Sequence, residues 1–144
     1  MNIIKNLPLA ISGLNLAILS LGKIFVDFKD VNFILGFIII LLIVLKFILY
    51  NVEFKTDLDN VVALSSFGTF SMSLMVLSTY LISLFPIFSG LVFIVWVLGV
   101  VGHIFLIVVF TKKYVLDSFE FTGVFATWWI VYIGITMASI TAPA

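Results

Sequence analysis

The segment FTGVFATWWIVYIGITMASITAP, residues 121–143, is a long apolar stretch that carries small and hydroxylated residues at regular intervals. On a helix that turns about 100° per residue, the small and hydroxylated residues fall on one side and the bulky aromatic residues on the other. In lipid, such a thin face serves close helix contact or lines a water-filled path, because exposed hydroxyls gain nothing from acyl chains. The thin side comprises Gly123, Thr127, Gly134, Ala138 and Thr141, and the aromatic side comprises Phe125, Trp129 and Tyr132.

The composition is typical of an integral membrane protein. Hydrophobic residues make up 64% of the chain and charged residues 10%, whereas soluble domains are about 45 to 50% apolar and about 25% charged. The mean hydropathy is +1.39. The formal net charge is zero without a basic block, so nothing favours nucleic acid as a partner. The absence of cysteine excludes disulfides and thiolate chemistry, and we expect neither a metal site nor a cofactor.

Capping and turn signals divide the chain into five predicted membrane helices in one membrane domain, without a soluble domain. Pro8 suits the first turn of a helix, Asp59 or Asn60 can cap the third helix, and Pro86 ends it. The predicted spans are 8–25, 31–50, 61–85, 87–111 and 121–140, against the roughly 17 to 25 residues that cross a bilayer. An alternative for the first span is a cleaved signal peptide, because residues 20–22 resemble a small-x-small cleavage site.

The first, third and fifth predicted helices carry aligned small and hydroxylated residues that the second and fourth lack. The second helix is apolar on every side, which is typical of lipid contact or deep packing. In the third helix, serine and threonine residues gather within about a third of the circumference. These hydroxyls either bond their own carbonyls and permit tight packing, or line a pore. The candidate pore-lining residues are Gly13, Ala17, Ser65, Thr69, Ser73, Gly123, Thr127 and Gly134.

Two ionisable residues, Lys46 and His103, fall within predicted spans. Lys46 lies one turn from the end of its helix, so we expect it to reach the membrane interface rather than to serve as a buried anion ligand. His103 is the only histidine; it either relays protons or bonds a neighbouring hydroxyl or carbonyl, and the second role is the commoner one. All seven cationic residues are lysines, so no arginine is available for a tight bidentate grip on a carboxylate.

The segments PLAISGLNLAILSLG, residues 8–22, and WWIVYIGITMASITAP, residues 128–143, resemble the TehA-type tellurite-resistance and dicarboxylate transporter family. That family also contains malate transporters and the plant slow anion channels. The resemblance implies a ring of ten helices in hairpins, with odd helices lining a central pore, even helices outside, and a trimeric assembly. The chain is similar to the amino-terminal half, so it is expected to be a fragment or a half-size protein that pairs with a second half. The aromatic gate implied for a late inner helix has no counterpart in this sequence.

The distribution of lysines predicts the orientation. Lys5, Lys46, Lys55, Lys112 and Lys113 fall on the side of the amino terminus, whereas only Lys23 and Lys29 fall on the other. Excess lysine marks the cytoplasmic face. We expect a bacterial or archaeal cytoplasmic membrane protein, and the lysine excess predicts that its amino terminus lies inside.

These patterns predict a transporter or channel for small anions of the C4-dicarboxylate, tellurite or inorganic type. Hydroxyl groups replace part of an anion's hydration without holding it firmly, which conduction requires. The alternative is a non-transporting membrane subunit or assembly partner whose small-residue faces dock other helices. An enzyme is not expected, because a catalytic site would need paired polar groups within the span and only His103 offers itself.

Overall fold

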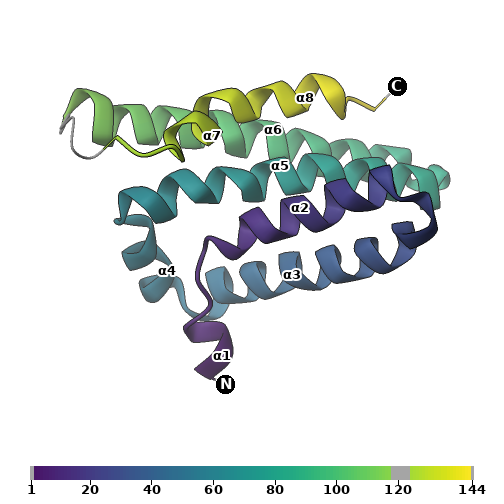
Figure 1. The fold of residues 1–144 in the computed structure, drawn as a ribbon, viewed down its shortest axis with the longest axis horizontal. Helices are drawn as coiled ribbons and strands as arrows, with labels where there is room; N and C mark the ends of the chain where they lie inside the picture. Colours follow the sequence, from purple (N-terminus) through teal and green to yellow (C-terminus); the bar gives the residue numbers. More distant parts are fainter. Residues whose placement is uncertain (1, 118–123, 144) are drawn as a thin grey trace.

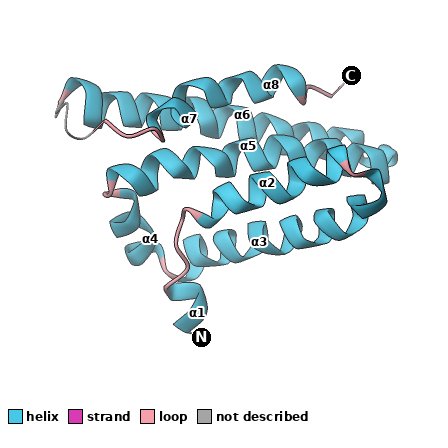
Figure 2. Cartoon of the chain, viewed as in Figure 1, coloured by secondary structure: helices cyan, strands magenta, loops and turns pink. Residues whose placement is uncertain are grey.

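The structure, a computed structural model, describes residues 2–117 and 124–143, and all of its regular elements in these ranges are helical. The principal helices run side by side and alternate in direction, whereas α1 and α4 lie together at one end (Figures 1 and 2). The helices are α1 (Asn2–Lys5), α2 (Ile11–Ile24), α3 (Lys29–Leu49), α4 (Asn51–Leu58), α5 (Val61–Leu84), α6 (Ser89–Phe110), α7 (Trp128–Ile133) and α8 (Met137–Ile140).

Among the residues that the structure describes, three helical segments are long and apolar enough to cross a membrane. They are Val26–Leu49, Val61–Leu84 and Pro86–Leu116. The second is α5 itself, and the other two are α3 and α6 with their short flanking turns. At about 1.5 Å per residue, each exceeds the roughly 30 Å thickness of the hydrocarbon core. The structure therefore supplies three membrane-span candidates, and the ring of five-helix halves stays a prediction.

The first and fifth predicted helices differ from their expected bounds. Residues 9 and 10 form a turn and α2 begins at Ile11 and ends at Ile24, so it is shorter than the predicted 8–25. The predicted 121–140 helix appears as the segment Trp128–Ile140, in which the 3-10 turn Gly134–Thr136 separates α7 from α8. Residues 121–123 lie outside the described ranges. Residues 51–60, which lie between the second and third predicted helices and were expected to form a polar loop, instead contain the two-turn helix α4.

Helix α5 lies at the centre of the packing. In its most apolar window 56% of the residues are buried, compared with 22% for the segments that contain α3 and α6. It packs against α2, α6, α7 and α8. Asn60 caps its start by accepting hydrogen bonds from the N–H groups of Val62 (2.9 Å) and Ala63 (3.2 Å). The helix with the most hydroxyls is thus the most enclosed one, and the apolar α3 and α6 lie outside it.

Small residues allow the helices to approach closely. A Cβ atom on Gly36 of α3 would lie 2.5 Å from Leu19 of α2, and one on Gly99 of α6 would lie 3.0 Å from the Ser71 carbonyl oxygen of α5. Buried apolar side chains fill the remaining space in three clusters. The cluster between α2, α3 and α5 contains Leu19, Ile40, Val76, Leu77 and Tyr80.

Candidate functional site

The candidate site has two parts, a line of hydroxyls along α5 and a polar cavity near its first residues. We call the first part the hydroxyl seam; it consists of Ser12 on α2, Ser65, Thr69 and Ser73 on α5, and Thr127 immediately before α7. Ser65, Ser73 and Ser12 are fully buried, and Thr69 is 5% exposed. The seam therefore lies between helices.

Hydrogen bonds join the three helices along the seam. Thr69 Oγ1 donates to Ser12 Oγ at 2.8 Å, and Ser12 Oγ donates to the Leu9 carbonyl at 2.7 Å. Ser65 Oγ donates to Thr127 Oγ1 at 2.7 Å. The first, third and fifth predicted helices thus share polar contacts, with α5 between the other two. Ser73 instead donates to the Thr69 carbonyl of its own helix at 2.8 Å.

The other sequence-predicted residues take different positions. A Cβ atom on Gly13 would lie 3.9 Å from Thr69 Oγ1, so Gly13 adjoins the seam. Ala17 is exposed one turn further along α2. Gly134 is buried against His103 rather than against a hydroxyl. Gly123 lies outside the described residues. The pore-lining role of the whole set stays a prediction.

His103 links α6 to α7. Its side chain is fully buried, and its Nε2 lies 3.0 Å from the Val131 carbonyl oxygen. Because a carbonyl only accepts, Nε2 carries the proton in this contact. This is the bond to a neighbouring carbonyl that was one of the two expected roles, and the proton-relay role stays a prediction.

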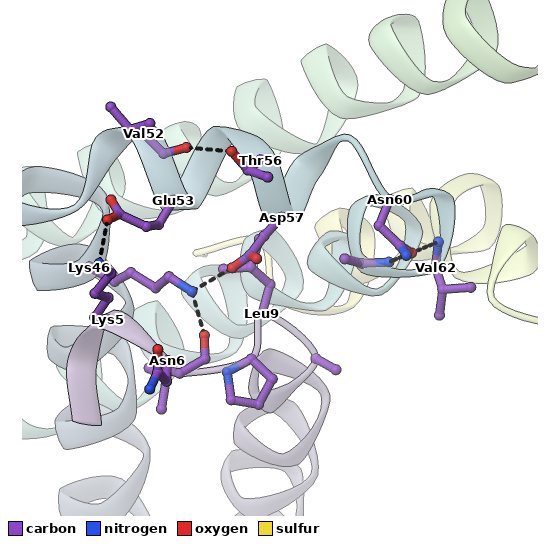
Figure 3. A pocket seen from close by; sticks show the side chains of 14 residues that line it. Lys5, Asn6, Leu9, Lys46, Val52, Glu53, Thr56, Asp57, Asn60 and Val62 are labelled. Atoms are coloured by element: carbon purple, nitrogen blue, oxygen red, sulfur yellow. Dashed lines mark hydrogen bonds and ion pairs between the residues drawn. The ribbon is translucent and has the colours of Figure 1, made fainter. Parts of the chain in front are cut away.

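The polar cavity holds an unexpected arrangement around Lys46 (Figure 3). The Lys46 side chain is 2% exposed, and its Nζ donates to the Leu7 carbonyl at 2.6 Å and to Asp57 Oδ2 at 2.5 Å. The Lys46 side chain is therefore enclosed by protein, and its expected position at the membrane interface stays a prediction. The side chain turns inward because its two partners, from the segment before α2 and from α4, meet at its tip.

The cavity has a volume of about 870 Å³ and lies between the residues before α2, the end of α3, α4 and the start of α5. Its walls include a second ion pair, Lys5 Nζ to Glu53 Oε1 at 3.1 Å. Hydrogen bonds from its own backbone N–H and from Lys5 hold the pKa of Glu53 below its usual value. Each of the two lysines is thus matched by one carboxylate from α4.

Sequence reasoning missed the two carboxylates on α4. Glu53 and Asp57 stand four residues apart, which places them on one side of a helix. Phe54, between them in sequence, is 5% exposed and packs with Leu7, Leu9 and Ile43. The sequence did contain a signal for a short amphipathic helix here, because two acids stand four residues apart and an apolar phenylalanine lies between them.

The chain matches no protein-family model, and comparisons with curated proteins and with solved structures give no match. The resemblance to the TehA-type family stays a prediction.

Proposed function

We propose that the chain is an integral membrane protein that forms part of a pathway for small anions. Three apolar segments long enough to span a bilayer support the membrane location. In this proposal α2, α5 and the α7–α8 segment wall the pathway, and α3 and α6 face lipid. The exposed surfaces of α3 and α6 are formed by large apolar side chains such as Ile38 and Phe105, which suit acyl chains.

The hydroxyl seam carries this proposal. It joins the three helices whose small and hydroxylated residues were predicted to face inward, and it does so at the most enclosed helix of the fold. Hydroxyls that bond one another can exchange those bonds for bonds to a hydrated anion without leaving a charge unpaired. The polar cavity adjoins the first turn of α5, close to the seam residue Ser65, because Asn60, Val62 and Ala63 line the cavity.

The substrate class and assembly follow from the resemblance. We propose C4-dicarboxylates, tellurite or inorganic anions as substrates, and a complete pathway that includes a second five-helix half or further copies arranged as a trimer. The five lysines placed on the amino-terminal side by sequence favour a cytoplasmic location for the end that carries α1 and α4. The membrane concerned is a bacterial or archaeal cytoplasmic membrane in this proposal.

Anion flux into liposomes that contain the full chain tests the seam. Replacing Thr69 and Thr127 by Val and Ser65 by Ala removes the seam hydroxyls at nearly constant volume. The matched control is Thr79→Val, because Thr79 Oγ1 donates only within α5, to the Val76 carbonyl at 2.7 Å. We expect the seam variants to lower flux or change anion selectivity while the control does neither. Unchanged flux and selectivity in folded seam variants would show that the hydroxyls serve packing alone.

The second candidate function is a non-transporting membrane subunit. The direct bonds between seam hydroxyls and the close glycine contacts favour it, because both are devices of helix association. Single cysteines distinguish the candidates cleanly in this cysteine-free chain. An anionic, water-soluble thiol reagent should label Ala17→Cys on a pathway wall but not Ile38→Cys on the lipid face. Absence of labelling at both positions would favour the subunit.

A further inference from the structure

Lys46 is a buried cation in the wall of an open cavity, on a helix that is otherwise almost entirely apolar (Figure 3). Removing an ammonium ion from water is costly, and buried ion pairs are often replaceable by apolar residues without loss of stability. Helix α4 is already anchored by Phe54, which is packed against Leu7 and Ile43. Holding α4 in place is therefore a weak physical reason for a charge at this position.

The two partners of the pair differ in their access to water. The Lys46 side chain is 2% exposed and the Asp57 side chain is 39% exposed. Both line the same cavity, whose volume of about 870 Å³ far exceeds that of one carboxylate. An anion that enters the cavity therefore reaches the ammonium at the position that Asp57 occupies.

The charge of the cavity depends on α4. Its lysines, Lys5 and Lys46, come from other parts of the chain, and both acids that pair with them come from one side of α4. The start of α5 adds the partial positive charge of a helix amino terminus. With both acids in place the cavity is balanced; with Asp57 turned away, it presents an uncompensated ammonium ion.

We propose that Lys46 is a binding group for carboxylate or oxyanion oxygens at the mouth of the pathway, and that Asp57 is its tethered competitor. This inference rests on the proposed function. The incoming anion replaces Asp57 on Nζ while the Leu7 carbonyl keeps its hydrogen bond. One charge-assisted hydrogen bond is exchanged for another, so the exchange is nearly balanced. The resident carboxylate lowers the affinity of the site, which favours release during transport.

Equilibrium binding of radiolabelled succinate to the full chain in nanodiscs tests this exchange. Asp57→Asn keeps a carbonyl oxygen near Lys46 but removes the competing charge. For a pair that is open about a tenth of the time, the Kd for succinate should fall about tenfold in this variant. Lys46→Met, and the neutral pair Lys46→Met with Asp57→Asn, should lose binding. Asp30→Asn, an exposed acid at the other end of α3 that does not line the cavity, is the matched control and should change Kd far less.

Folded Asp57→Asn protein that binds succinate no better than the wild type would overturn the proposal and assign the pair to structure. If that variant does not fold, labelling of the wild type by a water-soluble carbodiimide replaces it. Sulfate, an oxyanion that does not consume the carbodiimide as succinate would, should increase labelling of Asp57, located by mass spectrometry, and unchanged labelling would overturn the proposal. Flux measured in parallel separates this inference from the proposed function. If the wild type conducts anions but the binding changes are not seen, the role of Asp57 as a competitor is refuted. If Asp57→Asn binds more tightly but no variant conducts anions, the proposed pathway is refuted.

Discussion

Replacing Gly99 by Ala tests the close packing of α6 on α5. The added Cβ atom would lie 2.9 Å from Met75 Cγ, 3.0 Å from the Ser71 carbonyl oxygen and 3.3 Å from Leu74 Cβ. The carbonyl belongs to the backbone of α5 and cannot rotate away, so the two helices must separate. Such overpacking costs roughly 1 to 3 kcal/mol. The substitution also gains up to about 1 kcal/mol of helix propensity, so the net change is a destabilisation of about 0 to 2 kcal/mol.

Gly102→Ala is the matched control, because Gly102 lies one turn away on the same helix and faces the same partner. Its Cβ atom would lie 3.6 Å from Ser71 Oγ, an ordinary contact. It keeps the propensity gain without the clash. Unfolding by denaturing detergent, followed by circular dichroism and tryptophan fluorescence, should place Gly99→Ala about 1 to 3 kcal/mol below Gly102→Ala. Equal stability of the two variants would refute the helix spacing described for α5 and α6.

Two further predictions concern the polar cavity and the histidine. The pKa of Glu53 is lowered in the folded state, so its stabilising effect is present above the usual glutamate pKa and is lost as the pH falls through the folded value. Glu53→Gln should therefore flatten the acid limb of the stability profile in a titration of unfolding, and an unchanged limb would contradict the Lys5 pair. Gly134→Ala would place a Cβ atom 2.5 Å from His103 Cε1 and 2.7 Å from Nε2. It should be destabilising, and His103→Ala should relieve most of that effect; additive double-variant energies would contradict the contact.

The sequence predicted the elements whose causes are local. The helices α3, α5 and α6 fall within a few residues of the predicted 31–50, 61–85 and 87–111. Their long apolar runs, the Asn60 cap and Pro86 act over neighbouring residues, so they can be read without knowledge of the fold. The central position of α5 also agrees with its composition, because hydroxyls are better satisfied between helices than against acyl chains.

The features that depend on distant residues were not predictable in the same way. The position of Lys46 near a helix end does not reveal its partners, because it bonds Leu7 and Asp57, which come from two other segments. Ser65 and Thr127 each fall on a predicted face of small and hydroxylated residues, but the sequence does not show which faces meet. Their hydrogen bond depends on the packing of α7 on α5. The sequence therefore predicts which helix faces carry the hydroxyls of the seam, whereas the hydrogen bonds between them are seen only in the structure.

The segment Pro86–Leu116 has 31 residues, which at about 1.5 Å per residue gives a rod of some 45 Å. A bilayer core of about 30 Å covers only two thirds of such a rod at ordinary tilts. In its last turns Lys113 Nζ bonds Asp59 Oδ1 at 2.7 Å, and the Tyr114 hydroxyl donates to the Asp59 carbonyl at 2.8 Å. These two bonds fasten the end of the rod to Asp59, which joins α4 to α5 and precedes the capping residue Asn60.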